Sequence, residues 1–163
     1  ILNAQTPQQL AVTLALLSRA GISQLIGWYT SIDSKDPQKY TFYMTQSGLN
    51  LPDEEYYREE KYEQVCSAYI EHIARVFELT GLAEGFSLTP AEAAKLIFAH
   101  EAEIAAHHWD VVANRDAEAR YNPVDAAELE EKFPGFQFSH WLRALGADPD
   151  SMGKVVVSQP SFF

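Results

Sequence analysis

The densest group of side chains that could bind a metal lies within residues 100–108, whose sequence is H-E-A-E-I-A-A-H-H. In the zinc-binding pattern H-E-x-x-H, two imidazoles one helical turn apart hold the metal and the glutamate acts as general base. Ile104 occupies the position of the second histidine, and isoleucine cannot ligate zinc. His100, Glu103 and His107 share one helix flank and could form a metal site. This alternative is weaker, because such a flank is typically a solvated face.

Two titratable residues of the same predicted helix fall on its apolar face. Glu101 and His108 lie in a stripe otherwise formed by Ala94, Ile97, Phe98, Ile104, Ala105 and Val112. A buried carboxylate must find donors or take up a proton, because an unpaired buried charge is very costly. The two residues are about 10 Å apart along the helix axis, so we predict that Arg115 bridges them in a structural polar network. The alternative is a perturbed acid or base in a cleft.

Helix-start signals place these residues in a largely helical chain. A threonine or asparagine followed by proline is typical of a helix N-terminus and predicts helices near 7–19, 90–113 and 123–132. Apolar residues at helical spacing predict a longer helix over about 53–79 that Gly81 ends.

The remaining signals indicate a small amount of β-structure. Residues 25–32 and 40–46 are rich in β-branched and aromatic side chains and flank a turn-forming segment, which predicts a hairpin. Its aromatic residues could bind a peptide, but cross-strand packing is favoured. A short helix over 139–145 and a short strand over 154–158 follow. The fold class is therefore mostly α, a helical bundle-like lobe with a two-stranded β-hairpin and a short C-terminal strand, in one unit over 1–163.

Composition limits the possible partners. The chain has 163 residues and a formal charge of −11, with no basic cluster, so we predict no nucleic-acid binding. No run approaches the ~18 apolar residues of a membrane span, and we predict no membrane contact. Cys66 is the single cysteine and is interpreted as a small core residue. Because the chain starts at Ile1 and stops after an apolar run, we expect it to be part of a longer polypeptide.

The segment 46–57, Q-S-G-L-N-L-P-D-E-E-Y-Y, closely resembles the run Q-x-G-L-G-L-P-D-x-x-Y-Y of the neprilysin-like zinc metallopeptidases. Asn50 stands where that family usually has glycine, a mild departure because asparagine tolerates left-handed backbone geometry. Glu101, Ile104 and Trp109 are similar to the family's L-E-x-x-I-A-x-x-x-W helix. Further similarities lie at Arg115-Asp116, Tyr121-Asn122, Trp141, Leu145-Gly146 and 159–163, so the resemblance spans about residues 10–163.

The resemblance implies a function for a larger protein. In that family, H-E-x-x-H and the Glu of E-x-x-x-D hold the catalytic zinc, and neither motif occurs here. We therefore assign no catalytic, cofactor-binding or metal-ligating residue to this chain and expect zinc only in the parent enzyme. The chain is expected to be a non-catalytic helical lobe that closes over the catalytic lobe of the same polypeptide and limits the size of peptide substrates.

Two further expectations follow from this interpretation. The hairpin and residues 154–163 are expected to pack against polypeptide outside the chain. The alternative function is a stand-alone helical binding module that uses the aromatic hairpin or an acidic helix face.

Overall fold

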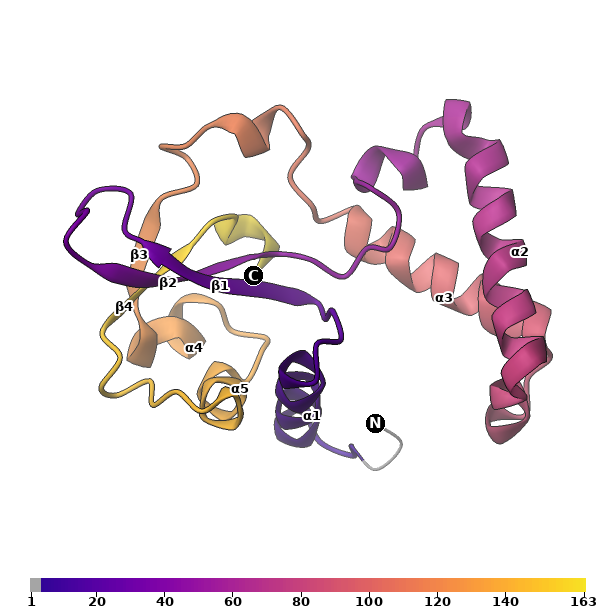
Figure 1. Cartoon of the computed structure of the whole chain (residues 1–163), viewed down its shortest axis with the longest axis horizontal. Helices are drawn as coiled ribbons and strands as arrows, with labels where there is room; N and C mark the ends of the chain where they lie inside the picture. Colours follow the sequence, from indigo (N-terminus) through magenta and orange to yellow (C-terminus); the bar gives the residue numbers. More distant parts are fainter. Residues whose placement is uncertain (1–3) are drawn as a thin grey trace. The chain divides into compact units, whose positions relative to one another are not determined.

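The structure is a computed structural model that describes residues 4–163, which divide into two compact units (Figure 1). The first unit combines the chain up to residue 48 with residues 112–163, and the second unit contains residues 49–111. That all 163 residues belong to one capping lobe of a larger peptidase stays a prediction.

The first unit is built on a four-stranded mixed sheet of order β1-β2-β4-β3. Strand β2 pairs antiparallel with β1 and parallel with β4, and β3 pairs antiparallel with β4. Its elements are α1 (Pro7–Arg19), β1 (Ile26–Ile32), β2 (Tyr40–Gln46), β3 (Asn122–Asp125), α4 (Leu129–Lys132), α5 (Phe138–Leu145) and β4 (Lys154–Val157).

One face of this sheet carries the core of the first unit. Met44, Val155 and Val157 of the central strands are fully buried against Phe138 and other apolar residues of the helices. Helix α1 packs on α5, and its buried residues on that core are two alanines spaced one turn apart. Such small side chains allow close approach of two helix backbones.

The second unit is a pair of packed helices, α2 (Glu63–Thr80) and α3 (Pro90–Ala105), preceded by the 3₁₀ turns Glu54–Tyr57 and Glu60–Tyr62. Gly81 ends α2 in the left-handed conformation, at a φ of 67°, which glycine adopts without steric cost. Thr89 and Glu92 form a capping box at the start of α3.

The predicted fold class is confirmed: the chain is mostly α-helical with a few strands. The helix at 7–19, the hairpin, the short helix near 139–145 and the strand near 154–158 are all present. Three predicted helices differ from the observed elements.

The predicted helix over 123–132 is wrong. Residues Asn122–Asp125 form strand β3, a 3₁₀ turn follows, and only Leu129–Lys132 is α-helical. Pro123 satisfies the local signal for a helix start, yet it is equally suited to an edge strand because it has no N–H to pair. Pairing of β3 with β4, about 30 residues later in the chain, decides between the two.

The other two helices are shorter than predicted. The helix predicted over 53–79 begins only at Glu63, because Asp53 caps a separate 3₁₀ turn by accepting a bond from the N–H of Glu55. The helix predicted over 90–113 ends at Ala105.

The expectation that residues 154–163 pack against polypeptide outside the chain is wrong for β4. Val155 and Val157 are fully buried, because β4 lies between β2 and β3 in the centre of the sheet. The buried Gln159 side chain then accepts bonds from the Thr45 hydroxyl and the Gln46 N–H, both at 3.0 Å.

Asp33 organises the turn of the β1–β2 hairpin. Its carboxylate accepts bonds from the N–H of Lys35 at 2.8 Å and of Asp36 at 3.1 Å, from the Thr41 hydroxyl at 2.8 Å, and from the Tyr121 hydroxyl at 3.0 Å. The Lys35 N–H makes the largest contribution to holding the pKa of Asp33 below its ordinary value of 3.8. The charged form is therefore the one that the folded chain stabilises.

We expect Asp33→Asn to lower the free energy of unfolding at neutral pH, because the amide cannot accept the same set of bonds. The Asp33 carboxylate contributes its stability above pH 3.8, and this contribution is lost as the pH falls through its lower folded pKa. The difference between wild type and variant should therefore shrink in strong acid. Urea unfolding across this pH range measures it, with Asp125→Asn on an exposed carboxylate as the control. A difference that is independent of pH would contradict this assignment.

Candidate functional site

The buried carboxylate of Glu101 joins the elements of the second unit. Glu101, on α3, is 5% exposed. Its Oε1 accepts a bond from Asn50 Nδ2 at 2.5 Å, its Oε2 accepts one from the Tyr57 hydroxyl at 2.7 Å, and the Tyr69 hydroxyl lies 2.9 and 3.0 Å from the two oxygens. We call Glu101, Asn50, Tyr57 and Tyr69 the Glu101 cluster.

The cluster joins segments that are far apart in the sequence. Asn50 precedes the 3₁₀ turn that carries Tyr57, Tyr69 lies on α2, and Glu101 lies on α3. The Tyr57 hydroxyl also accepts a bond from the Leu51 N–H at 3.1 Å. The L-N-L-P-D-E-E-Y-Y segment is thereby attached to both helices through a single carboxylate.

An aromatic side chain fixes the two tyrosine rings. Phe98 lies about one turn before Glu101 on α3, and its ring stacks on Tyr57 at 5.5 Å and meets the edge of Tyr69 at 6.4 Å between centroids. These contacts restrict the rings to orientations in which both hydroxyls point at the carboxylate.

The electrostatics of the cluster favour a structural role. Burial, more than the hydrogen bond to Glu101, raises the pKa of Tyr57 well above its usual range and that of Tyr69 to about 12. Both hydroxyls therefore remain protonated donors at neutral pH. The bonds that Glu101 accepts within the cluster all come from neutral donors, which hold the carboxylate in place, and the other three residues of the cluster include no second carboxylic acid.

The sequence prediction for Glu101 is partly confirmed. The residue is buried and hydrogen-bonded, as expected for a carboxylate on an apolar helix face. Its donors were not predicted, although a tyrosine such as Tyr69 within an apolar stripe indicates a hydroxyl that needs a buried partner. Arg115 belongs to the first unit, so the network of Glu101, His108 and Arg115 stays a prediction.

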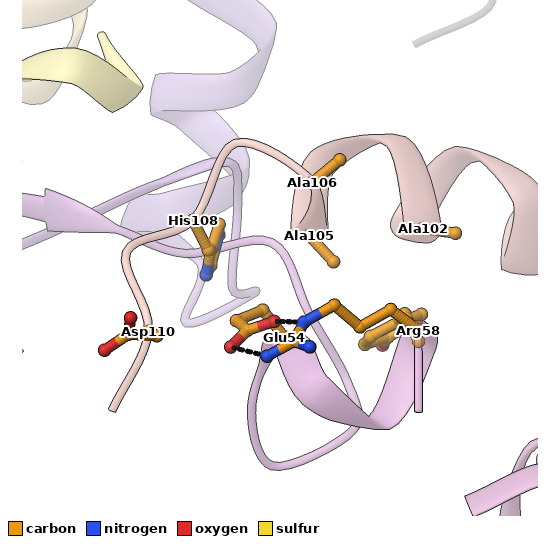
Figure 2. Close-up of a pocket in the computed structure, with 8 residues that line it drawn as sticks. Glu54, Arg58, Ala102, Ala105, Ala106, His108 and Asp110 are labelled. Atoms are coloured by element: carbon orange, nitrogen blue, oxygen red, sulfur yellow. Dashed lines mark hydrogen bonds and ion pairs between the residues drawn. The ribbon is translucent and has the colours of Figure 1, made fainter. Parts of the chain in front are cut away.

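His108 lines a hollow of about 310 Å³ in the second unit (Figure 2). Figure 2 shows the Glu54 carboxylate in this hollow facing the Arg58 guanidinium, with bonds from Nε at 2.6 Å and from Nη2 at 3.2 Å. Glu54 is buried and its hydrogen bond raises the pKa of Arg58. Arg58 also pairs with Glu59. Because the Arg58 guanidinium already compensates the charge of Glu54, this carboxylate is not an unpaired charge that would bind a cationic ligand.

His100, His107 and His108 do not form a metal site in the described structure. Within residues 4–163, no three His, Cys, Asp or Glu side chains are placed so that they could hold a metal ion. The weaker alternative of His100, Glu103 and His107 needed a helix that continues through His107, and α3 ends at Ala105.

The aromatic residues of the hairpin pack across its strands. Trp28 stacks on Phe42 with centroids 5.5 Å apart, and Tyr29 stacks on its direct partner Tyr43 at 5.0 Å. Cross-strand packing is the interpretation that the sequence favoured for these aromatic residues.

Over the described part of the chain, no helix combines the length and apolar character needed to cross a bilayer.

The sequence matches a known family over its whole length. The family described as peptidase family M13 covers residues 1–163. Endothelin-converting enzyme 1 of Rattus norvegicus is 30% identical over 118 residues, which are 72% of this chain and 15% of that protein. Neprilysin-3 of Drosophila melanogaster is 26% identical over 158 residues, which are 92% of this chain and 20% of that protein.

Solved structures give the same result. The zinc metalloprotease Zmp1 of Mycobacterium tuberculosis, in complex with an inhibitor, is 42% identical and superposes with a TM-score of 0.88 over 98% of this chain and 24% of that chain. The open state of Zmp1 gives a TM-score of 0.88 at 43% identity. The chain therefore spans no more than about a quarter of the length of these relatives.

We expect Glu101→Ala to destabilise the second unit by about 1–3 kcal/mol, because it leaves the partly buried hydroxyls of Tyr57 and Tyr69 without their acceptor. Chemical denaturation measures the loss, and Glu103→Ala on the exposed side of the same helix is the matched control. Equal stability of the two variants would contradict the assigned role of the cluster.

The raised pKa of Tyr69 predicts a pH dependence of stability. A folded pKa of about 12 against an ordinary value of 10.0 contributes stability that is complete below pH 10 and lost as the pH rises from 10 to about 12. Tyr69→Phe should therefore make the alkaline loss of stability shallower. Urea midpoints over this window test it, and Tyr40→Phe, at a site 77% exposed, should leave the slope unchanged. Identical slopes in wild type and Tyr69→Phe would overturn the prediction.

Proposed function

This chain belongs to peptidase family M13, in its N-terminal region, and we propose that it forms a non-catalytic helical lobe of a zinc metalloendopeptidase that cleaves oligopeptides. The observation that carries the proposal is the family match over residues 1–163 in a sequence with neither H-E-x-x-H nor E-x-x-x-D. The resemblance to neprilysin-like enzymes inferred from 46–57 is confirmed by these matches.

The proposed role of the lobe is to enclose the substrate chamber and to limit the size of the peptides that enter. The Glu101 cluster supports this role, because it holds the segment around Asn50 and both helices of the second unit in one arrangement with neutral donors. A chamber wall needs such a fixed shape and no reactive group of its own. The proposed partners are the catalytic lobe of the same polypeptide and the peptide substrate.

Zinc belongs to the proposed parent enzyme and not to the residues of this chain. The metal would activate a bound water and polarise the scissile carbonyl. The zinc metalloprotease structures that this chain resembles support zinc in the parent. The proposed contribution of this chain is to enclose the chamber and to exclude peptides that are too large, through packed helices and a strongly acidic surface.

We expect residues 1–163 alone to leave a fluorogenic peptide uncleaved, because no zinc-binding motif is present. A polypeptide that continues into a region with H-E-x-x-H should cleave the same peptide, and a chelator should abolish the cleavage. The measurement is the rate of fluorescence increase with each protein, with and without chelator.

Two outcomes would contradict the proposal. Chelator-sensitive cleavage by residues 1–163 would place the activity in this chain. A stop codon directly after Phe163 in the genomic reading frame would favour the stand-alone binding module.

A further inference from the structure

The two edges of the sheet in the first unit differ in their chemistry. The β3 edge is four residues long and contains Pro123 and Asp125, features that oppose pairing with a further strand. The β1 edge is seven residues long, and its sequence I-G-W-Y-T-S-I contains no proline and no charge. An edge of that composition is a template for another strand.

The hydrogen-bond register identifies the backbone groups on the open side of β1. The Asp33 N–H donates to the carbonyl of Lys39, and the Ser158 N–H donates to the carbonyl of Met44. Antiparallel ladders alternate between bonded and non-bonded pairs. Because the backbone of Met44 bonds toward β4, the backbone N–H and carbonyl of its β1 partner Trp28 point away from β2. The backbone N–H and carbonyl of Thr30 point the same way. Within the described residues, no strand lies beyond β1.

A hollow adjoins the first half of β1. It has a volume of about 250 Å³, and Ile22, Ile26 and Trp28 supply apolar walls. Its other lining residues are Ser18, Gly21, Ser23, Gln24, Gly27 and Ser47. None of the lining residues is charged, so the hollow fits one uncharged side chain of moderate size.

The edge is presented in a fixed conformation. The stacked pairs Trp28–Phe42 and Tyr29–Tyr43 hold β1 against β2, while Trp28 remains 38% exposed and Tyr29 43% exposed. A strand that is ordered before binding loses little conformational entropy when a partner pairs with it.

We propose that the β1 edge is an accessory binding site for an extended peptide substrate, which adds a fifth strand to the sheet and inserts one uncharged side chain into the hollow. Only an extended polypeptide presents alternating donors and acceptors at the spacing of Trp28 and Thr30. The formal charge of −11 disfavours an acidic peptide or a second copy of this chain as the occupant. The inference rests on the proposed function in that peptides are the substrates of the parent.

The test uses a fluorescein-labelled peptide of alternating threonine and valine, with a central leucine and a lysine at each end. Fluorescence anisotropy with residues 1–163 should show saturable binding. Methylation of the peptide nitrogens on alternate residues should weaken binding by about tenfold or more in one register and leave it unchanged in the other. Equal effects of the two methylation patterns would overturn strand addition.

Variants of the protein test the same site. Thr30→Pro removes an outward N–H at an edge where proline is tolerated and should weaken binding by about tenfold, whereas Thr30→Val should bind normally. Circular dichroism checks that both variants fold, and the methylated peptides keep the test valid if the proline variant does not. Replacing the central leucine of the peptide with glutamate should also abolish binding, and unchanged affinity would contradict a neutral hollow.

Two outcomes would assign the edge to another occupant and overturn the proposal. Binding by residues 1–163 but not by a catalytically active parent would show that the parent covers β1 with its own polypeptide. A dimer in sedimentation velocity that Thr30→Pro dissociates would identify a second copy. In either case, cleavage by the parent would leave the proposed function standing.

Discussion

The burial of the Glu101 carboxylate is the constraint on which the second unit depends. A carboxylate that is 5% exposed must be surrounded by donors, since the free energy of an unpaired buried charge would exceed the stability of a small domain. Asn50, Tyr57 and Tyr69 meet this requirement from three different segments. Hydrogen bonds to one carboxylate therefore connect the helices and the segment before them. Because Glu101 must keep these donors, the possible arrangements of the three segments are restricted.

The Asn50 side chain gives this arrangement a feature of its own. In the neprilysin-like run that 46–57 resembles, glycine usually stands at this place, and glycine has no side-chain donor. Here Asn50 adds a bond at 2.5 Å to Oε1, next to the bonds from the tyrosine hydroxyls. Asn50 thus connects the segment before the 3₁₀ turn directly to the carboxylate on α3.

The first unit depends on a different kind of constraint, the insertion of β4 into the centre of the sheet. β4 pairs with β2 on one side and with β3 on the other, and its valines complete the core. Two strands alone would be marginally stable, so the hairpin needs this partner from the far end of the chain. The role in a chamber wall that we propose is based on the match to peptidase family M13, and the β1 edge is the surface of this unit that we propose for peptides.

Local signals in the sequence were sufficient where the deciding interactions are local. The capping box of Thr89 and Glu92, the C-terminal Gly81 and the alternating hairpin residues act within a few positions of one another, so the elements that they define were predictable, as was the family from the motif at 46–57. Glu101 could be recognised as buried because helical periodicity places it on an apolar face. Its donors and the strand at Pro123 were decided only by tertiary structure, because Tyr69 and β4 approach them across long sequence separations that no local pattern encodes.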